Sequence, residues 1–265
     1  MLIAVILLLV GIAMFPFLWI VQMSLKTQLE AFTMPPKLIF LPTFENYVSL
    51  LQDNSFLHTF ANSTLASTIT VVLSMVIGVP AAYVLSRSQT KADSSIALWV
   101  LTTRMAPPIA FAIPFFLIFQ KIGLIDTIQG LVLVYLTFNL SLVMWMMRTF
   151  FDGLPLSLEE AAWIDGANIP QTFLRIALPL SVPGLATTAI FCFLLAWNDF
   201  FFALILTRSA TMTAPVGIVN FMNYEGWAWG KITAGSVLIM LPVVAFSLLV
   251  RKYLIRGLTA GAIKG

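Results

Sequence analysis

Long apolar runs divide the chain, and short polar segments separate them. The runs lie at about residues 2–24, 60–86, 94–119, 129–148, 183–206 and 232–250. A run of about 20 apolar residues crosses a bilayer, and an open backbone segment satisfies its hydrogen bonds in lipid only as a helix. The pattern therefore predicts an all-α membrane protein, with six transmembrane helices forming a single transmembrane domain over residues 1–265.

The first apolar run is expected to be an uncleaved span. It has no basic segment before it, and it is longer than the apolar core of a typical signal peptide. Composition supports an integral membrane protein, because 60% of the residues are hydrophobic, 9% are charged and the mean hydropathy is +0.99. An ordinary soluble domain has roughly 25% charged residues.

Candidate metal, disulfide and nucleic-acid chemistry is absent from the sequence. Cys192 is the only cysteine and lies within an apolar run, which excludes an intrachain disulfide and a cysteine metal cluster. The net charge of +3 is not gathered on a basic face, so we expect no nucleic-acid partner. We expect no catalytic residues and no metal ligands in this chain.

The distribution of lysine and arginine predicts the orientation. With the N-terminus inside, the inner segments carry eight of these residues and the outer segments five, while Arg104 remains within a span. Basic residues are enriched on the cytoplasmic side of membrane proteins. We therefore expect both termini, and the polar hairpin at residues 152–181, to lie in the cytoplasm.

That hairpin carries the signals of a short helix. Ser157 followed by Glu160 has the spacing of a capping box, which predicts a helix over residues 158–165. Glu159 and Glu160 in the first turn favour the positive end of the helix dipole. Gly166 stands where a left-handed residue would end the helix.

A second helix start follows closely. Asn168 and Gln171 have capping-box spacing, and Pro170 is tolerated in a first turn. A helix of about eight residues is marginal by itself, and the sequence places no soluble domain around it. The adjacent Ala161 and Ala162 leave one side flat enough for close approach. The segment therefore predicts a docking surface for another protein.

The hairpin also carries a family motif. The residues Glu160-Ala161-Ala162, Gly166 and Ile176-x-Leu178-Pro179 match the EAA motif of inner-membrane permease subunits of binding-protein-dependent ABC importers. The resemblance covers nearly the whole chain, including Pro35-Pro36 and Asn46-Tyr47 in the first loop, Trp197-Asn198-Asp199, and the tail at residues 257–265. In these features the chain resembles the carbohydrate-uptake subfamily, on the side of the maltose-type second permease subunit.

The resemblance implies a type I ABC importer permease fold and a division of labour among chains. The helix would be a coupling helix held in a groove of an ATPase, and its ATPase-coupling residues would be Glu159, Glu160, Ala161, Ala162, Asp165 and Gly166. Partners would be a second permease subunit in a heterodimer, two cytoplasmic ATPase subunits, an extracytoplasmic solute-binding protein and the bilayer of the bacterial inner membrane. ATP and Mg would bind the ATPase chains, with no cofactor on this chain, which would be a transport subunit and not an enzyme.

Polar residues within the spans suggest a substrate pathway. Arg104 lies about 15 Å from the inner end of its span, and Pro107 and Pro108 should open the helix beside it because proline removes amide donors. Facing lipid, Arg104 would cost at least about 2.5 kcal/mol. It is either a substrate ligand or a structural residue, for which Asp199 is the first partner to consider. The other polar candidates are Asn139, Ser141, Asn198 and Asp199.

The sequence is compatible with several classes of substrate. A polar lining suits an oligosaccharide, a polyol, a glycerol phosphate ester or a sulfonated sugar, and Arg104 favours an anionic sugar. The alternative is an ion-coupled secondary transporter of polar solutes, which should show inverted repeats with paired helix breaks; one Pro-Pro break and no repeat are visible. A membrane enzyme would need a catalytic constellation, which is missing.

Overall fold

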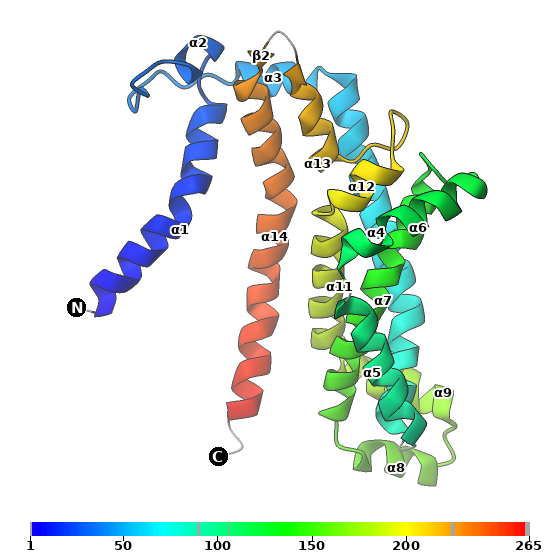
Figure 1. Cartoon of the computed structure of the whole chain (residues 1–265). Coiled ribbons are helices and arrows are strands. Elements are labelled where there is room, and N and C mark those ends of the chain that lie inside the picture. The colour runs from blue at the N-terminus through cyan, green and yellow to red at the C-terminus, as the bar shows by residue number, and fades with distance from the viewer. Residues whose placement is uncertain (1, 89–90, 106, 224–225, 263–265) are drawn as a thin grey trace. The chain divides into compact units, whose positions relative to one another are not determined.

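The computed structural model describes residues 2–88, 91–105, 107–223 and 226–262 (Figure 1). The chain forms two compact units, the first made of Met1–Ser63 and Met212–Val244, and the second of Thr64–Thr211 and Ala245–Gly265. Two long helices, α4 (Asn54–Arg87) and α14 (Trp229–Ala262), contribute to both units.

The first unit contains α1 and a set of short elements. They are α1 (Leu2–Ser24), α2 (Gln28–Ala31), α3 (Glu45–Leu51), α13 (Ala214–Gly217), the 3-10 helix η2 (Ile218–Phe221) and the strands β1 (Met222–Asn223) and β2 (Gly226–Trp227). The strands pair antiparallel, with Met222 opposite Trp227. Apart from this short pair, the regular secondary structure of the described residues is helical, as the sequence predicts.

Side-chain hydrogen bonds hold the loop that follows α1 in place. Asn46 donates its amide to the carbonyl oxygens of Ser24 at 2.9 Å and Lys26 at 2.7 Å. The hydroxyls of Ser24 and Tyr47 lie 2.6 Å apart. Lys26 is buried, with its ammonium 5.0 Å from the centre of the Phe40 ring. Asn46 and Tyr47, part of the family resemblance, therefore have a structural task in this unit.

The second unit holds most of the elements. After its part of α4 come α5 (Lys91–Met105), α6 (Pro108–Lys121), α7 (Ile128–Asp152), α8 (Ser157–Ile164), α9 (Ile169–Thr172), the π-helix η1 (Phe173–Ala177), α10 (Leu178–Leu180), α11 (Val182–Trp197) and α12 (Phe201–Leu206). Helix α7 is central, since it packs against α11, α5 and α12. Figure 1 shows α8 lying across the end of α7.

A stripe of small residues follows one face of α4. Ala66, Thr70, Ser74, Gly78 and Ala82 recur at every fourth position and are all buried. Residues four apart share a helix face, and small side chains let helices in a membrane approach closely. At Gly78 the stripe meets α7, where an added Cβ would lie 2.7 Å from a methyl carbon of Val143.

The candidate spans agree in part with the six expected. By length and composition, four described helices could cross a membrane, namely Leu2–Ser24, Asn54–Arg87, Ile128–Asp152 and Trp229–Leu249. A fifth results if Ile169–Leu180 and Val182–Trp197, bent by 78°, form one span. The expected span at 94–119 is divided into α5 and α6, with Pro107 extended before α6. The break predicted from the paired prolines is confirmed.

The expected span at 183–206 is also interrupted, which the sequence analysis did not predict. Helix α11 ends at Trp197 and α12 begins at Phe201. A carboxylate oxygen of Asp199 accepts the amide of Ala203 at 3.1 Å, so its side chain satisfies a donor at the start of α12.

Candidate functional site

Helix α8 begins differently from the prediction. The expected capping box of Ser157 and Glu160 is wrong: Leu156 is the N-cap, and no side chain bonds to the cap. The reason is that Leu156 is already helical, with φ −62° and ψ −29°. Backbone carbonyls therefore accept the first amides, as from Glu159 to Leu156 at 2.9 Å. Ser157 lies inside the first turn.

The end of α8 matches the prediction. Gly166 has φ +86°, in the left-handed region that favours glycine. Its amide donates to Trp163 at 3.0 Å, and the amide of Ala167 donates to Ala162 at 2.9 Å. These two bonds form a Schellman motif, which closes the helix and turns the chain sharply.

The second predicted helix start is also confirmed. The side chain of Asn168 accepts the amide of Gln171, and the side chain of Gln171 accepts the amide of Asn168, both at 3.0 Å. Pro170 lies in the first turn of α9. The hairpin is thus ordered by caps at the end of α8 and the start of α9.

The two neighbouring glutamates of α8 differ in exposure. Glu160 is exposed, whereas Glu159 is 1% exposed and is the buried residue of α8. One oxygen of Glu159 accepts from Arg87 Nη2 at 2.7 Å and Nε at 2.9 Å, and the other accepts from the Tyr83 hydroxyl at 2.7 Å. Both partners lie near the end of α4, so Glu159 attaches α8 to that helix.

Further polar contacts extend this attachment to α7. Arg87 Nη1 donates to the Ser86 hydroxyl at 3.1 Å, and that hydroxyl donates to Asp152 at the end of α7. Asp152 also lies 3.7 Å from Arg148, one turn earlier in α7. This network could not be predicted from the sequence, because Tyr83 and Glu159 are separated by 76 positions and no local pattern connects them.

An aromatic cluster packs beside this hydrogen-bond network. The Tyr83 ring lies 5.4 Å from Phe151 and 4.9 Å from Phe173, measured between ring centres. The Tyr83–Phe151 pair is edge-on, a favourable arrangement for aromatic rings. Tyr83, Phe151 and Cys192 belong to one buried core cluster, and Phe173 packs against it. Cys192 is buried in apolar surroundings, as expected from its position.

The exposed side of the hairpin combines acidic and apolar groups. Of the residues predicted for ATPase coupling, Glu160, Ala161, Asp165 and Gly166 are exposed and Ala162 is half-buried. Ile164 is 87% exposed beside them. A shallow hollow of about 540 Å³ adjoins this surface, lined by Trp163, Ala167, Asn168, Ile169 and Pro170. Exposed apolar side chains with a polar rim are typical of protein–protein contacts.

A small cavity in the second unit brings together two of the predicted pathway residues. Its volume is about 240 Å³, and its lining residues are Pro108, Tyr135, Phe138, Asn139, Leu195, Ala196, Asp199 and Phe202. Asn198 does not line it; its side chain is exposed and donates to the Leu194 carbonyl at 2.9 Å. Pro107 lies at the adjacent helix break. The side chain of Arg104 is outside the described part of the structure.

The cavity contains polar atoms without hydrogen bonds. Asn139 donates to the Tyr135 carbonyl at 3.0 Å, but its own amide oxygen is buried and lacks a partner among the described residues. The Tyr135 hydroxyl interacts electrostatically with Asp199 but forms no hydrogen bond of standard geometry within the same part of the chain. Phe138 and Phe202 add aromatic surface, with ring centres 5.2 Å apart. Sequence reasoning missed Tyr135, although it lies one helical turn from Asn139.

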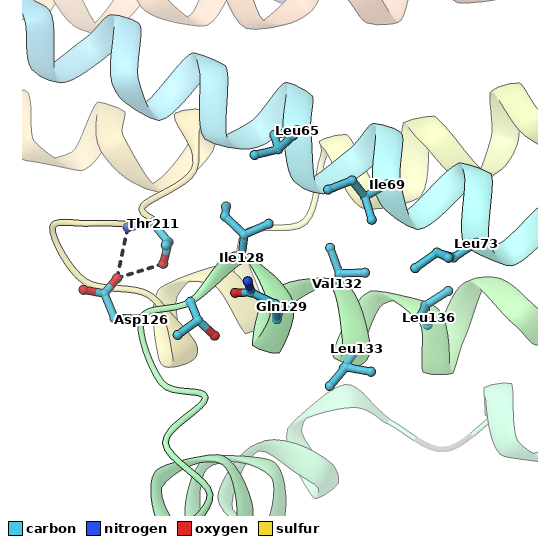
Figure 2. Close-up of a pocket in the computed structure, with 11 residues that line it drawn as sticks. Leu65, Ile69, Leu73, Asp126, Ile128, Gln129, Val132, Leu133, Leu136 and Thr211 are labelled. Atoms are coloured by element: carbon cyan, nitrogen blue, oxygen red, sulfur yellow. Dashed lines mark hydrogen bonds between the residues drawn. The ribbon is translucent and has the colours of Figure 1, made fainter.

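A larger apolar groove of about 710 Å³ lies between α4 and α7 (Figure 2). Leu65 and Ile69 of α4 face Ile128 and Val132 of α7 across it, and one end is polar, at Asp126 and Thr211. The polar end adjoins two connecting segments of the second unit.

Asp126 joins these two segments, 122–127 and 207–211. Its backbone has φ +55°, and its carboxylate accepts the amides of Arg208 at 2.8 Å, Thr211 at 3.0 Å and Ala210 at 3.3 Å, and the Thr211 hydroxyl at 2.7 Å. Burial alone would raise the pKa of Asp126, but these hydrogen bonds outweigh burial and hold the pKa below its usual value. No pattern in the sequence indicated this contact.

Comparison with known proteins identifies the family. A family model described as "Binding-protein-dependent transport system inner membrane component" matches residues 74–259, well over half of the chain. The chain belongs to this family. The match includes the α8 hairpin, the cavity and the α7 side of the groove.

Relatives of this permease match along nearly its whole length. The trehalose transport system permease protein SugB of Mycobacterium tuberculosis is 38% identical, over 97% of this chain and 95% of its own. The trehalose/maltose transport system permease protein MalG of Thermococcus litoralis is 37% identical, over 96% and 92%. A bacterial ABC transporter involved in the import of the acidic polysaccharide alginate is similar in structure, with a TM-score of 0.79, 27% identity and 95% coverage of each chain.

These matches confirm the identification made from the EAA motif. The chain is a multi-pass permease of the inner membrane, a transport component and not an enzyme, with an ABC importer permease fold. Its similarity to carbohydrate permeases confirms the sugar-uptake subfamily.

Proposed function

We propose that this permease carries a sugar or sugar derivative through the inner membrane, driven by ATP hydrolysis on a separate subunit that docks on α8. Related permeases are named for the carbohydrates that they transport. SugB is a trehalose permease, and MalG is a trehalose/maltose permease. SmoH of Agrobacterium fabrum, 33% identical over 95% of this chain, is a sulfoquinovosyl glycerol permease. The observation that carries the coupling role is α8 itself, a short helix with its outer side open and its inner side bonded to α4.

The docking face would be the outer side of the hairpin. Glu160 and Asp165 offer carboxylates to a basic groove, while Ala161 and Ala162 permit close approach and Ile164 supplies apolar contact. Gly166 would shape the turn that lets the helix enter the groove. Glu159 would act from the inner side, through α4.

The assembly follows from this docking face. The permease would pair with a second permease subunit, two ATPase subunits would bind the paired hairpins, and an extracytoplasmic solute-binding protein would deliver the substrate. The hairpin and both termini would then be cytoplasmic, and ATP and Mg would bind the ATPase chains. The charge distribution along the sequence supports this orientation.

The substrate pathway would pass the helix break and the cavity beside α7. Asn139 and Asp199 would meet sugar hydroxyls there, because the amide oxygen of Asn139, which has no partner among the described residues, can accept a hydrogen bond. Pro107 would keep α5 and α6 apart, and Asn198 would lie at the second break. Arg104 would contact the substrate or a structural carboxylate, and an oligosaccharide, a polyol or an anionic sugar all fit this chemistry.

Uptake by the reconstituted complex tests the proposal. The permease with its co-purifying subunits and binding protein is placed in proteoliposomes and supplied with labelled trehalose, maltose or sulfoquinovosyl glycerol. We expect uptake of at least one sugar that requires ATP and persists when ionophores remove ion gradients. Uptake that needs an ion gradient and not ATP would favour the secondary transporter instead, and uptake of none would refute these substrates.

A further inference from the structure

The inner side of α8 is held by a charged group. Glu159 is the buried residue of this helix, whereas Leu158 and Ile164 are 46% and 87% exposed. No apolar side chain of α8 is buried as fully as Glu159. The hydrogen bonds that Glu159 accepts from Arg87 and Tyr83 therefore hold α8 against α4.

We propose that Glu159 and Arg87 are positioning residues that transmit a displacement of α8 to α4. The inference rests on the proposed docking of an ATPase on the outer side of α8. It assigns different tasks to two adjacent glutamates: Glu160 would face the partner chain, and Glu159 would convert the movement of the docked helix into movement of a membrane helix.

The geometry of the pair suits this task. Arg87 places two nitrogens, Nε and Nη2, on one carboxylate oxygen at 2.9 and 2.7 Å, and the Tyr83 hydroxyl holds the other at 2.7 Å. Charge-assisted bonds from a planar guanidinium restrict both distance and direction, unlike apolar contacts. The side chains of Arg87 and Glu159 are 15% and 2% exposed, so water competes little for the contact.

The bonded groups lead directly into the packed part of the unit. Through Ser86, the Arg87 guanidinium is connected to Asp152 of α7. The Tyr83 ring lies between Phe151 and Phe173 in the core cluster. A shift of α8 would therefore act on both α4 and α7.

The first test compares uptake with ATP hydrolysis in the whole reconstituted complex. Glu159→Gln keeps the size of the side chain and removes its charge. We expect sugar uptake per ATP hydrolysed, measured with labelled trehalose or maltose, to fall roughly five- to tenfold, in the range of coupling factors between sites. The ATPase should co-purify as before. An unchanged ratio of uptake to hydrolysis would overturn the proposal.

Matched variants separate transmission from docking and from folding. Thr149→Val, on an exposed surface of α7, should leave the ratio unchanged. Glu160→Gln should lower ATPase co-purification, since it alters the outer face. If the complex with Glu159→Gln does not assemble, Tyr83→Phe is measured instead, because it removes one hydrogen bond from the same carboxylate. A ratio of uptake to ATP hydrolysis equal to wild type in Tyr83→Phe would then overturn the link.

Exchange of the charges provides the rescue. Glu159→Arg alone brings two arginines together. Adding Arg87→Glu restores an ion pair in which the two charges have exchanged positions. We expect the double variant to recover uptake per ATP relative to Glu159→Arg. If the exchange recovers only membrane yield while uptake per ATP never changes, the pair is structural and transmits nothing.

A readout that needs no sugar separates this inference from the proposed substrate class. In a Cys192→Ala background, Leu65→Cys places a thiol on the exposed side of α4, in the groove of Figure 2. Its rate of maleimide labelling should change when the complex is trapped with ATP and vanadate, and Glu159→Gln should abolish that change. A change that persists in Glu159→Gln overturns the link, whichever sugar the wild-type complex carries.

Discussion

Neighbouring residues of one helix can have opposite surroundings, as Glu159 and Glu160 show. Successive positions on a helix are about 100° apart, since 3.6 residues make a turn, so one glutamate points to α4 and the other to solvent. Both are expected to be coupling residues. The local sequence pattern predicts that the helix exists but not which carboxylate is buried, because Arg87 lies far away in the chain.

Asp126 gives a prediction at the same scale. Its carboxylate accepts four hydrogen bonds, so Asp126→Asn should lower the free energy of unfolding by about 1–2 kcal/mol at pH 7, after allowance for partial exposure. A pKa lowered by folding adds stability above the unfolded-state pKa, about 3.9, and loses it as pH falls through the folded-state value. The difference between variant and wild type should therefore shrink below about pH 4.

Thermal unfolding of the detergent-purified permease, followed at several pH values, measures this difference. The exposed Glu45→Gln is the control and should change the melting temperature little at any pH. An equal deficit for Asp126→Asn at pH 7 and at low pH would contradict the argument from the lowered pKa.

Gly166 determines how α8 ends. With φ +86°, a β-branched residue there would be strained by roughly 1–2 kcal/mol. We expect Gly166→Val to leave the permease in the membrane but to lower ATP hydrolysis stimulated by the loaded binding protein. Gly166→Asn, which tolerates the left-handed conformation, should lose much less. Equal activity of the two variants would show that the turn is not needed.

At the scale of whole elements, the sequence predicts helices better than their interruptions. The apolar pattern located α1 and α7 to within a few residues, whereas α4 begins before its predicted run, at Asn54, and α14 continues beyond its predicted run, to Ala262. The paired prolines predicted the break between α5 and α6. The break before α12 has no such signal, because Asn198 and Asp199 are compatible with a continuous helix. The side chain of Asp199 satisfies one backbone donor there, the amide of Ala203.

The packing of α4 against α7 yields a prediction about elements. Gly78 leaves no room for a side chain beside Val143, so Gly78→Leu should destabilise the unit by about 1–3 kcal/mol through overpacking. The control is Gly11→Leu, since a Cβ at Gly11 would meet nothing within 4 Å in the described structure. Membrane yield and melting temperature should fall for Gly78→Leu alone.

For the whole molecule, the sequence predicts the protein family more completely than it predicts the residues of the substrate cavity. Composition and the EAA motif led to the permease family, which the comparisons confirm. The cavity beside α7 depends on residues from separate helices, and only its polar members, Asn139 and Asp199, stand out in an apolar sequence. Its aromatic members, such as Phe138 and Phe202, resemble every other apolar residue of the spans.

Orientation is the property of the whole molecule that most needs measurement, because the excess of inner basic residues is only eight to five. In a Cys192→Ala background, Ile164→Cys on the hairpin and Ile39→Cys in the first loop introduce thiols at positions 87% and 95% exposed. We expect an impermeant thiol reagent to label Ile39→Cys in intact cells and Ile164→Cys only in inverted vesicles stripped of ATPase. Labelling of Ile164→Cys from outside would place α8 beyond the reach of a cytoplasmic ATPase, and the coupling role would fail with it.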